Sequence, residues 1–230
     1  MKYSLILIPL LSHGISFLKT TKDIQLSGGS TSFISILQDS RCDIIVNLII
    51  SLIITLLILR SIKIKSGFKN FFISAIFILY INKLYNLVTY VHISQFFKPI
   101  VSSPYFVEGA YNLTPLKNIN LIFYSKSTFI HVIGNSLLLS PLAFFIHYYK
   151  WSRSYFKTFL SLLGVITFIE FFQLIQTYIG SMYNSNLLRA FDIDDFILNS
   201  ISVILGLISF IIYKKSKFIK RFSKKLAKSK

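Results

Sequence analysis

Charged residues, and acidic residues above all, are scarce in this chain of 230 residues. Only 14% of its residues are charged, whereas 53% are hydrophobic, and the mean hydropathy is +0.64. This balance excludes an ordinary soluble protein and is typical of a multi-spanning membrane protein. The single cysteine, Cys42, excludes an intrachain disulfide and a cysteine metal cluster. The sequence also contains no phosphate-binding loop, nucleophile elbow or His-rich zinc motif, and no internal repeat.

Long apolar runs occupy most of the chain. A helix needs about 20 residues to cross a hydrocarbon layer. Four runs are close to that length: 71–97, 127–147, 158–188 and 196–213. Lys83 is the one charged residue of the run at 71–97, Glu170 is the one charged residue of the run at 158–188, and the other two runs have none. A shorter run at 44–59 predicts a fifth span, and the run at 3–18 predicts a sixth. The sequence therefore predicts an all-α bundle of about six transmembrane helices.

The apolar run at 3–18, which lies nearest the N-terminus, has two interpretations. Lys2 precedes it, as in a signal peptide, and removal of such a peptide would leave five spans. No convincing small-x-small cleavage site follows, so we favour a retained helix in residues 1–18. The residues that weaken this helix are Pro9, Ser12, His13, Gly14 and Ser16.

The basic residues predict the orientation of the helices. With six spans and the N-terminus inside, the cytoplasmic parts hold 17 basic residues and no acidic one: Lys2, the loops at 60–69 and 150–157, and the tail at 214–230. The positive-inside rule then places both termini in the cytoplasm. The tail is expected to face anionic lipid headgroups. No nucleic-acid-binding module accompanies the net charge of +17, so nucleic acid is not an expected partner.

Polar residues within the predicted spans gather in the outer half of the membrane, at about 1.5 Å of depth per helical residue. Hydrocarbon penalises a charged group by a few kcal/mol unless the group faces a partner or water. Convergence on one polar site is therefore expected. The residues concerned are His131, Asn135, Glu170, Gln173, Thr177, Asp192, Asp194, Asp195 and Asn199, with Lys83 just past the midplane.

Two of these sets have helical spacing. Residues at i, i+3 and i+7 share a helical face, and this spacing holds for 170, 173 and 177 and again for 192, 195 and 199. We expect the two polar faces to meet. Asp194 points to another side of its helix and is expected to face a loop or a neighbouring helix.

Structural roles compete with a functional site. Asp192 and Asp195 can cap the last helix, where the helix dipole favours acidic residues. Glu170 lies more than a turn from either end of its helix, so its structural alternative is a buried ion pair with Lys83 or Arg189. The remaining residues have simpler interpretations: Pro141 as a tolerated kink, and His131 and His147 as packing or interfacial residues rather than metal ligands.

At these residues the sequence resembles the VanZ-like family, named for a protein that lowers susceptibility to teicoplanin. The segment NLTPL (112–116) resembles the family's Asn-Leu-x-Pro-Phe, and IGNSLLLSPLAF (133–144) resembles its Asn-x-x-x-Phe-x-Pro-x-Gly. IEFFQ (169–173) matches Glu-x-x-Gln. RAFDIDDFILNSIS (189–202) matches Arg-x-Phe-Asp-x-Asp-Asp-x-x-x-Asn-x-x-Gly, which is long and specific.

The chain departs from the family pattern at three positions. Leu116 replaces a phenylalanine, and Ala143 and Ser202 each replace a glycine. Small residues govern how closely membrane helices approach, so these changes bear on helix packing and leave every ionisable motif residue intact. The resemblance divides the chain into an N-terminal transmembrane region without a recognised motif (1–111), a VanZ-like transmembrane domain (112–213) and a basic cytoplasmic tail (214–230).

The resemblance implies a polytopic protein of the bacterial plasma membrane that acts at the cell envelope, and it implies no reaction. One interpretation is an outward-facing polar site that holds the head of a lipid-linked wall precursor or of an amphiphilic antibiotic such as teicoplanin. Another is a membrane enzyme that uses carboxylates for acid–base work or to hold a divalent cation. A transporter is the third. The site would consist of Asn135, Glu170, Gln173, Arg189, Asp192, Asp194, Asp195 and Asn199, with Lys83 as an ion-pair partner.

Overall fold

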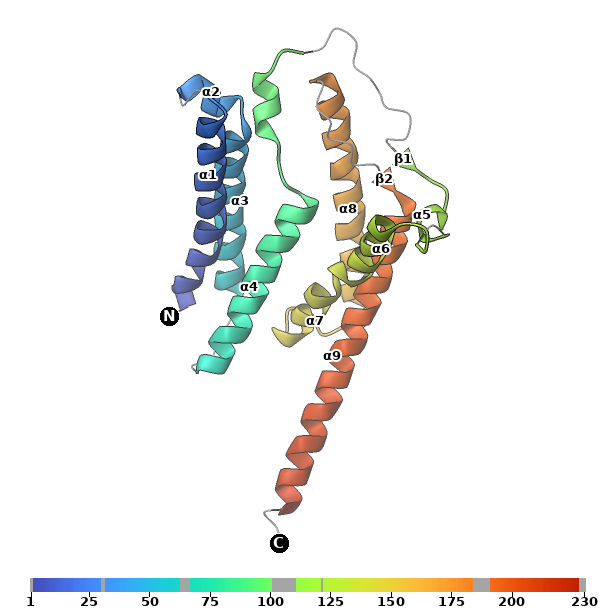
Figure 1. Ribbon diagram of the computed structural model, residues 1–230. Helices are drawn as coiled ribbons and strands as arrows, with labels where there is room; N and C mark the ends of the chain where they lie inside the picture. Colours follow the sequence, from blue (N-terminus) through green and yellow to red (C-terminus); the bar gives the residue numbers. More distant parts are fainter. Residues whose placement is uncertain are drawn as a thin grey trace. The chain divides into compact units, whose positions relative to one another are not determined.

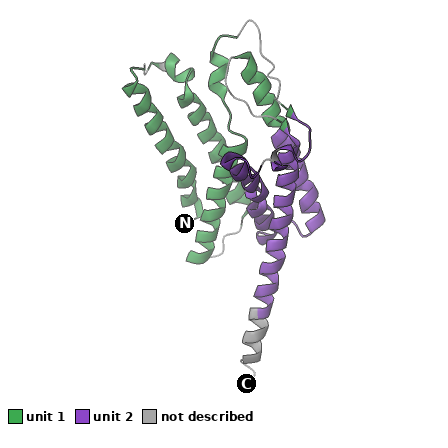
Figure 2. Ribbon diagram, turned by 45° about the vertical axis from the view of Figure 1, so that its right-hand side comes forward, with its two compact units in different colours: residues 1–111, 171–191 green, residues 112–170, 192–230 purple. Residues whose placement is uncertain are grey.

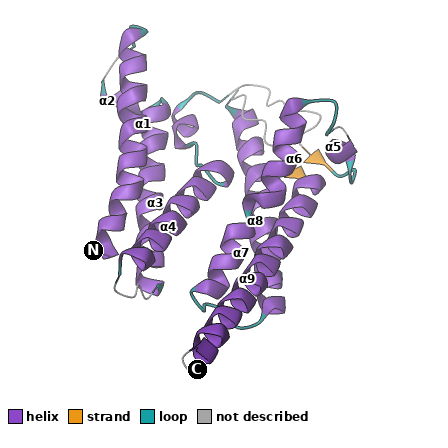
Figure 3. Cartoon of the chain, turned by 60° about the horizontal axis from the view of Figure 1, so that its bottom comes forward, coloured by secondary structure: helices purple, strands orange, loops and turns teal. Residues whose placement is uncertain are grey.

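A computed structural model describes residues 2–29, 32–62, 67–100, 111–120, 122–183 and 191–227, apart from the side chains of Phe33, Asn118 and 220–227. Helices dominate these residues, and only two short strands accompany them (Figures 1 and 3). Six segments are long and apolar enough to cross a membrane: Lys2–Leu26, Ser40–Ser61, Phe68–Val88, Lys126–Tyr148, Tyr155–Met182 and Ile193–Ile219. The predicted all-α fold with about six spans is confirmed.

The chain divides into two compact units, which are described separately (Figure 2). Unit 1 consists of residues 1–111 and 171–191, and unit 2 consists of residues 112–170 and 192–230. The division passes through one long helix, α8 (Tyr155–Met182), whose first part belongs to unit 2 and whose last part belongs to unit 1.

Unit 1 is built around a central helix, α3 (Ser40–Ser61), which packs against α1 (Leu7–Leu26) and α4 (Phe68–Val88). The 3-10 helices η1 (Lys2–Ile6) and η2 (Ile93–Phe97) and the short helix α2 (Phe33–Leu37) also contact α3. Asp39 starts α3, because its carboxylate accepts a hydrogen bond of 2.7 Å from the backbone N–H of Arg41.

A stripe of buried polar residues runs along α3 at every fourth position: Asp43, Asn47, Ser51 and Thr55. Each has a partner on another element of unit 1. His13 of α1 lies 3.1 Å from the Ser51 hydroxyl, and the Asn82 amide of α4 donates to the Thr55 hydroxyl at 3.1 Å. These bonds join three helices, as polar side chains do where lipid offers no partner.

Asp43 and Asn47 hold the segment that follows α4. The Asn47 amide donates to the Val91 carbonyl at 2.7 Å and its oxygen accepts from the Val91 N–H at 2.9 Å. The Asp43 carboxylate accepts from the backbone N–H and the hydroxyl of Ser94 at 2.7 and 3.0 Å. The apolar run at 71–97 is therefore not one helix, since α4 ends at Val88 and the chain folds back onto α3.

Unit 2 is organised by α9 (Ile193–Ala227), which packs against α5 (Lys117–Asn120), α6 (Lys126–Leu138) and α7 (Ser140–Tyr148). The strands β1 (Tyr111–Asn112) and β2 (Phe191–Asp192) pair just before α9 begins. At 1.5 Å per residue the 35 residues of α9 extend for about 52 Å. This length exceeds the roughly 30 Å of a hydrocarbon core, so α9 continues into the basic tail.

The helix expected around 127–147 breaks into α6 and α7 at Leu139. Pro141 lies in the first turn of α7, where its missing N–H costs no hydrogen bond. The hydroxyl of Ser202 on α9 accepts hydrogen bonds from the backbone N–H groups of Leu139 and Ser140, at 2.9 and 2.8 Å. The kink expected at Pro141 is thus a break whose free N–H groups α9 satisfies.

Gly206 marks a close approach of α9 to α7. A Cβ atom added there would overlap the backbone carbonyl oxygen of Ser140 and would lie 2.8 Å from the Cβ of Ala143. Only a residue without a side chain fits this crossing, which lies one turn beyond Ser202. The helices pack closely although Ala143 and Ser202 stand where the family pattern has glycine.

We expect Gly206→Ala to destabilise the protein by about 1–3 kcal/mol, because the added methyl group must displace the Ser140 backbone. Thermal unfolding in detergent measures the effect. Gly134→Ala and Gly164→Ala are the matched controls, since neither added Cβ meets an atom within 4 Å. The controls should be neutral or slightly stabilising, because alanine favours helix over glycine. Equal behaviour of all three variants would contradict the close crossing.

Candidate functional site

Carboxylates gather where α9 begins. Asp192 lies in β2, immediately before the helix, and its Oδ1 atom accepts hydrogen bonds of 2.9 Å from the backbone N–H of Asp194 and from the side-chain amide of Asn112 in β1. The first bond is the N-cap bond expected of an aspartate at this position. Asp192 therefore caps α9 and also ties the NLTPL segment to the start of the helix.

Asp194 faces a loop, as its position predicts, and it binds the same segment at 112–116 as Asp192, whereas Asp195 binds α6. Its side chain is fully buried, and Oδ1 accepts a hydrogen bond from the backbone N–H of Leu116. Leu116 has a φ of +66°, a left-handed conformation that is uncommon for a residue with a side chain. The Asp194 carboxylate stabilises this turn, so its described contacts give it an anchoring role.

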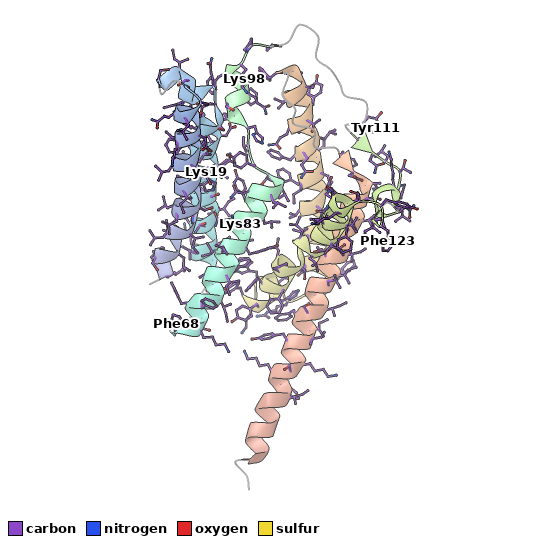
Figure 4. The ribbon with its side chains drawn as sticks, in the orientation of Figure 1. Lys19, Phe68, Lys83, Lys98, Tyr111 and Phe123 are labelled. Atoms are coloured by element: carbon purple, nitrogen blue, oxygen red, sulfur yellow. The ribbon has the colours of Figure 1, made fainter. Side chains whose placement is uncertain are left out.

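Glu170 of α8 is a deeply buried acid that forms no ion pair with the described residues. Its side chain is 1% exposed, and its Oε2 atom accepts one long hydrogen bond, 3.4 Å, from the backbone N–H of Asp192. Within the described residues no ion pair reaches Glu170. Lys83, an expected partner, is an exposed residue of α4 in unit 1 (Figure 4), and Arg189, the other one, lies outside the described residues.

Asp195 reaches α6. Its Oδ1 atom accepts a hydrogen bond of 2.6 Å from the Asn135 amide, and its Oδ2 atom lies 3.5 Å from Nε2 of His131. The Asp195 side chain is 16% exposed and that of His131 is 49% exposed. These two side chains form the open edge of the cluster, whereas Glu170 and Asp194 lie inside it.

Asn199 lies one turn beyond Asp195 on the same face of α9. It is 4% exposed, and its Oδ1 atom has no hydrogen-bond partner among the described residues. Side chains in a helix lean toward its N-terminus, so the Asn199 amide leans toward Asp195. A buried acceptor without a donor costs about 1–3 kcal/mol.

Gln173 and Thr177 belong to the part of α8 that lies in unit 1. The Gln173 amide donates to the Val88 carbonyl at 3.2 Å, and the neighbouring Gln176 donates to the Tyr90 carbonyl at 2.6 Å. Both glutamines satisfy carbonyl groups at or just beyond the end of α4, and Thr177 is buried. Within unit 2, Glu170 is the member of that polar face that contacts the start of α9.

Several members of the cluster were not expected as site residues. Asn112 was noted only in its motif, and His131 was interpreted as a packing or interfacial residue, although its position one turn before Asn135 places both on one helical face. The sequence could not predict the hydrogen bond from the Leu116 N–H to Asp194, or those that the Ser202 hydroxyl accepts at the break between α6 and α7, because both depend on tertiary contacts.

Four carboxylates meet at the start of α9: Glu170, Asp192, Asp194 and Asp195. Their described hydrogen-bond donors are the side-chain amides of Asn112 and Asn135 and the backbone N–H groups of Leu116, Asp192 and Asp194, and the His131 ring lies beside Asp195. Burial raises the pKa of Asp192 above its ordinary value, an effect that hydrogen bonds from Asp194 and Asn112 oppose. Within the described residues, no group of three or more His, Cys, Asp or Glu side chains is arranged to hold a metal ion.

Comparison with known proteins gives one result. A family model described as VanZ/LLP1 matches residues 71–214. This range includes most of α4 and all of η2, as well as every motif that carried the resemblance noted from the sequence. No curated protein and no solved structure matches the chain significantly.

The three departures from the family pattern have different consequences in the structure. Leu116 keeps its backbone bond to Asp194, because that bond uses only the N–H group. Ala143 is fully buried against Gly206. Ser202 gains a role that glycine cannot have, since its hydroxyl accepts the two free N–H groups at the break between α6 and α7.

Ser202→Ala should destabilise the protein by about 1–3 kcal/mol, because two buried backbone N–H groups lose their acceptor. Thermal unfolding in detergent measures the loss. Ser209→Ala is the matched control on the same helix, since Ser209 is exposed and bonds only to the carbonyl of Leu205. A Ser202 variant as stable as the Ser209 variant would show that the hydroxyl does not support the break.

Proposed function

Because the chain belongs to the VanZ/LLP1 family and is a multi-pass membrane protein, we propose that it acts at the bacterial cell envelope and lowers susceptibility to teicoplanin or related amphiphilic antibiotics. The site would be the polar cluster at the start of α9, opening to the external side of the plasma membrane. Its ligand would be the head of the antibiotic or of a lipid-linked wall precursor. In this proposal the chain divides into an N-terminal transmembrane region (1–111), a VanZ-like domain (112–213) and a basic tail (214–230), although the family match itself begins at residue 71.

The observation that carries this proposal is the position of the cluster along α9. Asp195 and Lys214 lie 19 residues apart on one continuous helix, which corresponds to about 29 Å. That is close to the thickness of a hydrocarbon core. If the basic end lies at the cytoplasmic interface, as the positive-inside rule predicts, the acidic end lies at the external interface.

The basic end of α9 supports the same orientation. Lys214, Lys215 and Lys217 are exposed, and the ammonium group of Lys217 lies over the Tyr213 ring at 5.6 Å from its centroid. Tyrosine and lysine side chains are typical of the membrane–water interface. In this proposal the tail contacts anionic lipid headgroups and not nucleic acid.

An amphiphile suits the surroundings of the cluster. Ile130, Ile133 and Leu137 on α6 are exposed apolar residues, and Val132 on α6 and Leu198 on α9 are buried. A ligand could therefore bind its polar head at Asp195 and His131 while its apolar chain lies along α6. Polar groups that converge within apolar surroundings are the usual composition of a ligand site.

The His131–Asp195 pair favours a second candidate function, a membrane enzyme acting on a lipid-linked envelope substrate. A half-exposed imidazole 3.5 Å from a carboxylate has the groups for general acid–base catalysis. Proton transfer to or from a bound substrate is the step that this pair could support.

We expect Glu170→Gln and Asp195→Asn to abolish the change in susceptibility while membrane abundance stays normal, because each removes a carboxylate of the cluster. The measurement is a susceptibility profile against teicoplanin, vancomycin and lipid-targeting peptides in a susceptible strain, with abundance checked by blot. Asp23→Asn is the matched control, since it removes an exposed carboxylate of α1. If both site variants behaved like the parent protein, the polar-site proposal would be wrong.

A further inference from the structure

We propose that unit 2 has a defined site for one anionic phospholipid, in which the lipid phosphate lies between lysines of α9 and the turn that joins α7 to α8. This goes beyond a general attraction of the basic tail to the membrane surface. The inference rests on the proposed orientation, which puts this end of α9 in the cytoplasmic leaflet, and it does not involve the antibiotic or the polar cluster. Three features of unit 2 carry it: a face of α9 that follows α7, cations on both sides of the end of α7, and aromatic rings at the same level.

One face of α9 follows α7 to its end. Gly206 lies against the backbone of Ser140, at the start of α7. The Tyr213 ring lies 6.0 Å from the ring of Tyr148, the last residue of α7. The two helices therefore run side by side in the same direction, and α9 continues past the end of α7 (Figure 1). Lys217 follows Tyr213 by one turn, so it is the next residue on this face.

Two lysine side chains of α9 lie close to the end of α7. The Lys217 ammonium group lies over the Tyr213 ring, 5.6 Å from its centroid, and donates a hydrogen bond of 3.5 Å to the Tyr213 hydroxyl. This side chain therefore turns back along α9 toward the end of α7. The charge of Lys214 acts on the His147 ring, in the last turn of α7. Both lysines are exposed, so an anion can reach them.

The turn after α7 adds cations on the other side. Residues 149–154 join α7 to α8, and Lys150 and Arg153 of this turn are exposed. The backbone N–H groups of Lys150 and Trp151 donate hydrogen bonds of 3.1 and 2.9 Å to carbonyl groups of the last turn of α7, those of His147 and Ile146. The turn is therefore held against the end of α7, where the α9 lysines also lie.

The acidic residues of unit 2 lie at the other end of α9. Residues 112–170 and 192–230 contain four carboxylates, and all four belong to the cluster at the start of α9. Asp195 and Lys214 lie about 29 Å apart along the helix. Unit 2 itself therefore brings no carboxylate to its basic end, and the charge of this end favours an anion.

Aromatic rings place this end at the depth of lipid headgroups. The Tyr149 ring lies 5.8 Å from the Trp151 ring, beside the contact between Tyr148 and Tyr213. Tyrosine and tryptophan gather at the membrane–water interface, and basic pockets between helices on the cytoplasmic side bind anionic headgroups. Lysine and arginine form charge-assisted hydrogen bonds with phosphate oxygens. The anion that fits this place is the phosphate of a phospholipid.

The chain's single tryptophan, Trp151, can report lipid binding at this turn. The purified full chain is reconstituted in phosphatidylcholine vesicles, and part of the lipid is replaced by phosphatidylglycerol or phosphatidylcholine with brominated acyl chains. Bromine atoms quench the fluorescence of a nearby tryptophan. We expect the apparent affinity from quenching to be about fivefold or more higher for brominated phosphatidylglycerol than for brominated phosphatidylcholine, since a lysine at the membrane surface contributes about that factor.

Paired variants separate a defined site from a general attraction to the basic tail. Lys214→Gln combined with Lys217→Gln should abolish the preference for phosphatidylglycerol, and the corresponding arginine pair should keep it. Lys224→Gln combined with Lys225→Gln removes the same charge further along α9 and should have little effect. Equal losses in the two glutamine pairs, at equal helical circular dichroism signals, would overturn the site. Equal quenching of the parent protein by the two brominated lipids would also overturn it.

The lipid site and the proposed function can fail separately, because the quenching experiment contains no antibiotic. A parent protein that lowers teicoplanin susceptibility but shows no preference for phosphatidylglycerol would refute the lipid site alone. A parent protein that prefers phosphatidylglycerol but leaves susceptibility unchanged would refute the proposed function alone.

Discussion

The structure depends on one constraint: a polar group in hydrocarbon must find its partner within the protein. Unit 1 meets this constraint along α3, where Asp43, Asn47, Ser51 and Thr55 bond to neighbouring elements. Both units meet it only in part. Among the described residues, buried oxygens of Thr21, Asn82 and Asn86 in unit 1 and of Asn199 in unit 2 have no hydrogen-bond partner. At the start of α9, Asp192 and Asp194 have hydrogen-bond donors, while Glu170 has one long bond.

The polar residues of α3 and those at the start of α9 differ in accessibility. The α3 residues are buried, and their hydrogen bonds join helices of unit 1. The cluster at the start of α9 has an open edge at His131 and Asp195, whereas Glu170 and Asn199 are buried. The Asp192 carboxylate has two structural roles, since it caps α9 and also holds Asn112.

Composition and hydropathy were enough to predict the helical membrane fold, because the length of an apolar run and its lack of charged residues can be read directly from the sequence. Helical spacing predicted that Asp192 and Asp195 share a helical face, but Asp192 lies in β2 and, like Asp194, binds the segment at 112–116, whereas Asp195 binds α6. It could not predict which neighbour each would meet. The break at Leu139, the fold-back after Val88 and the contact between His131 and Asp195 depend on tertiary packing, and the Ser202 hydroxyl shows this most clearly, since its acceptor role requires a break in another helix.

The most direct test of the account is the sidedness and accessibility of the cluster. The chain's single cysteine, Cys42, is buried, so a Cys42→Ser background allows single cysteines to be introduced at His131, at Thr114 and in the tail at Ser216. An impermeant maleimide should label His131→Cys and Thr114→Cys in intact cells and label Ser216→Cys only after permeabilisation. Labelling of Ser216→Cys in intact cells, or no labelling of His131→Cys from either side, would contradict an outward-facing polar site.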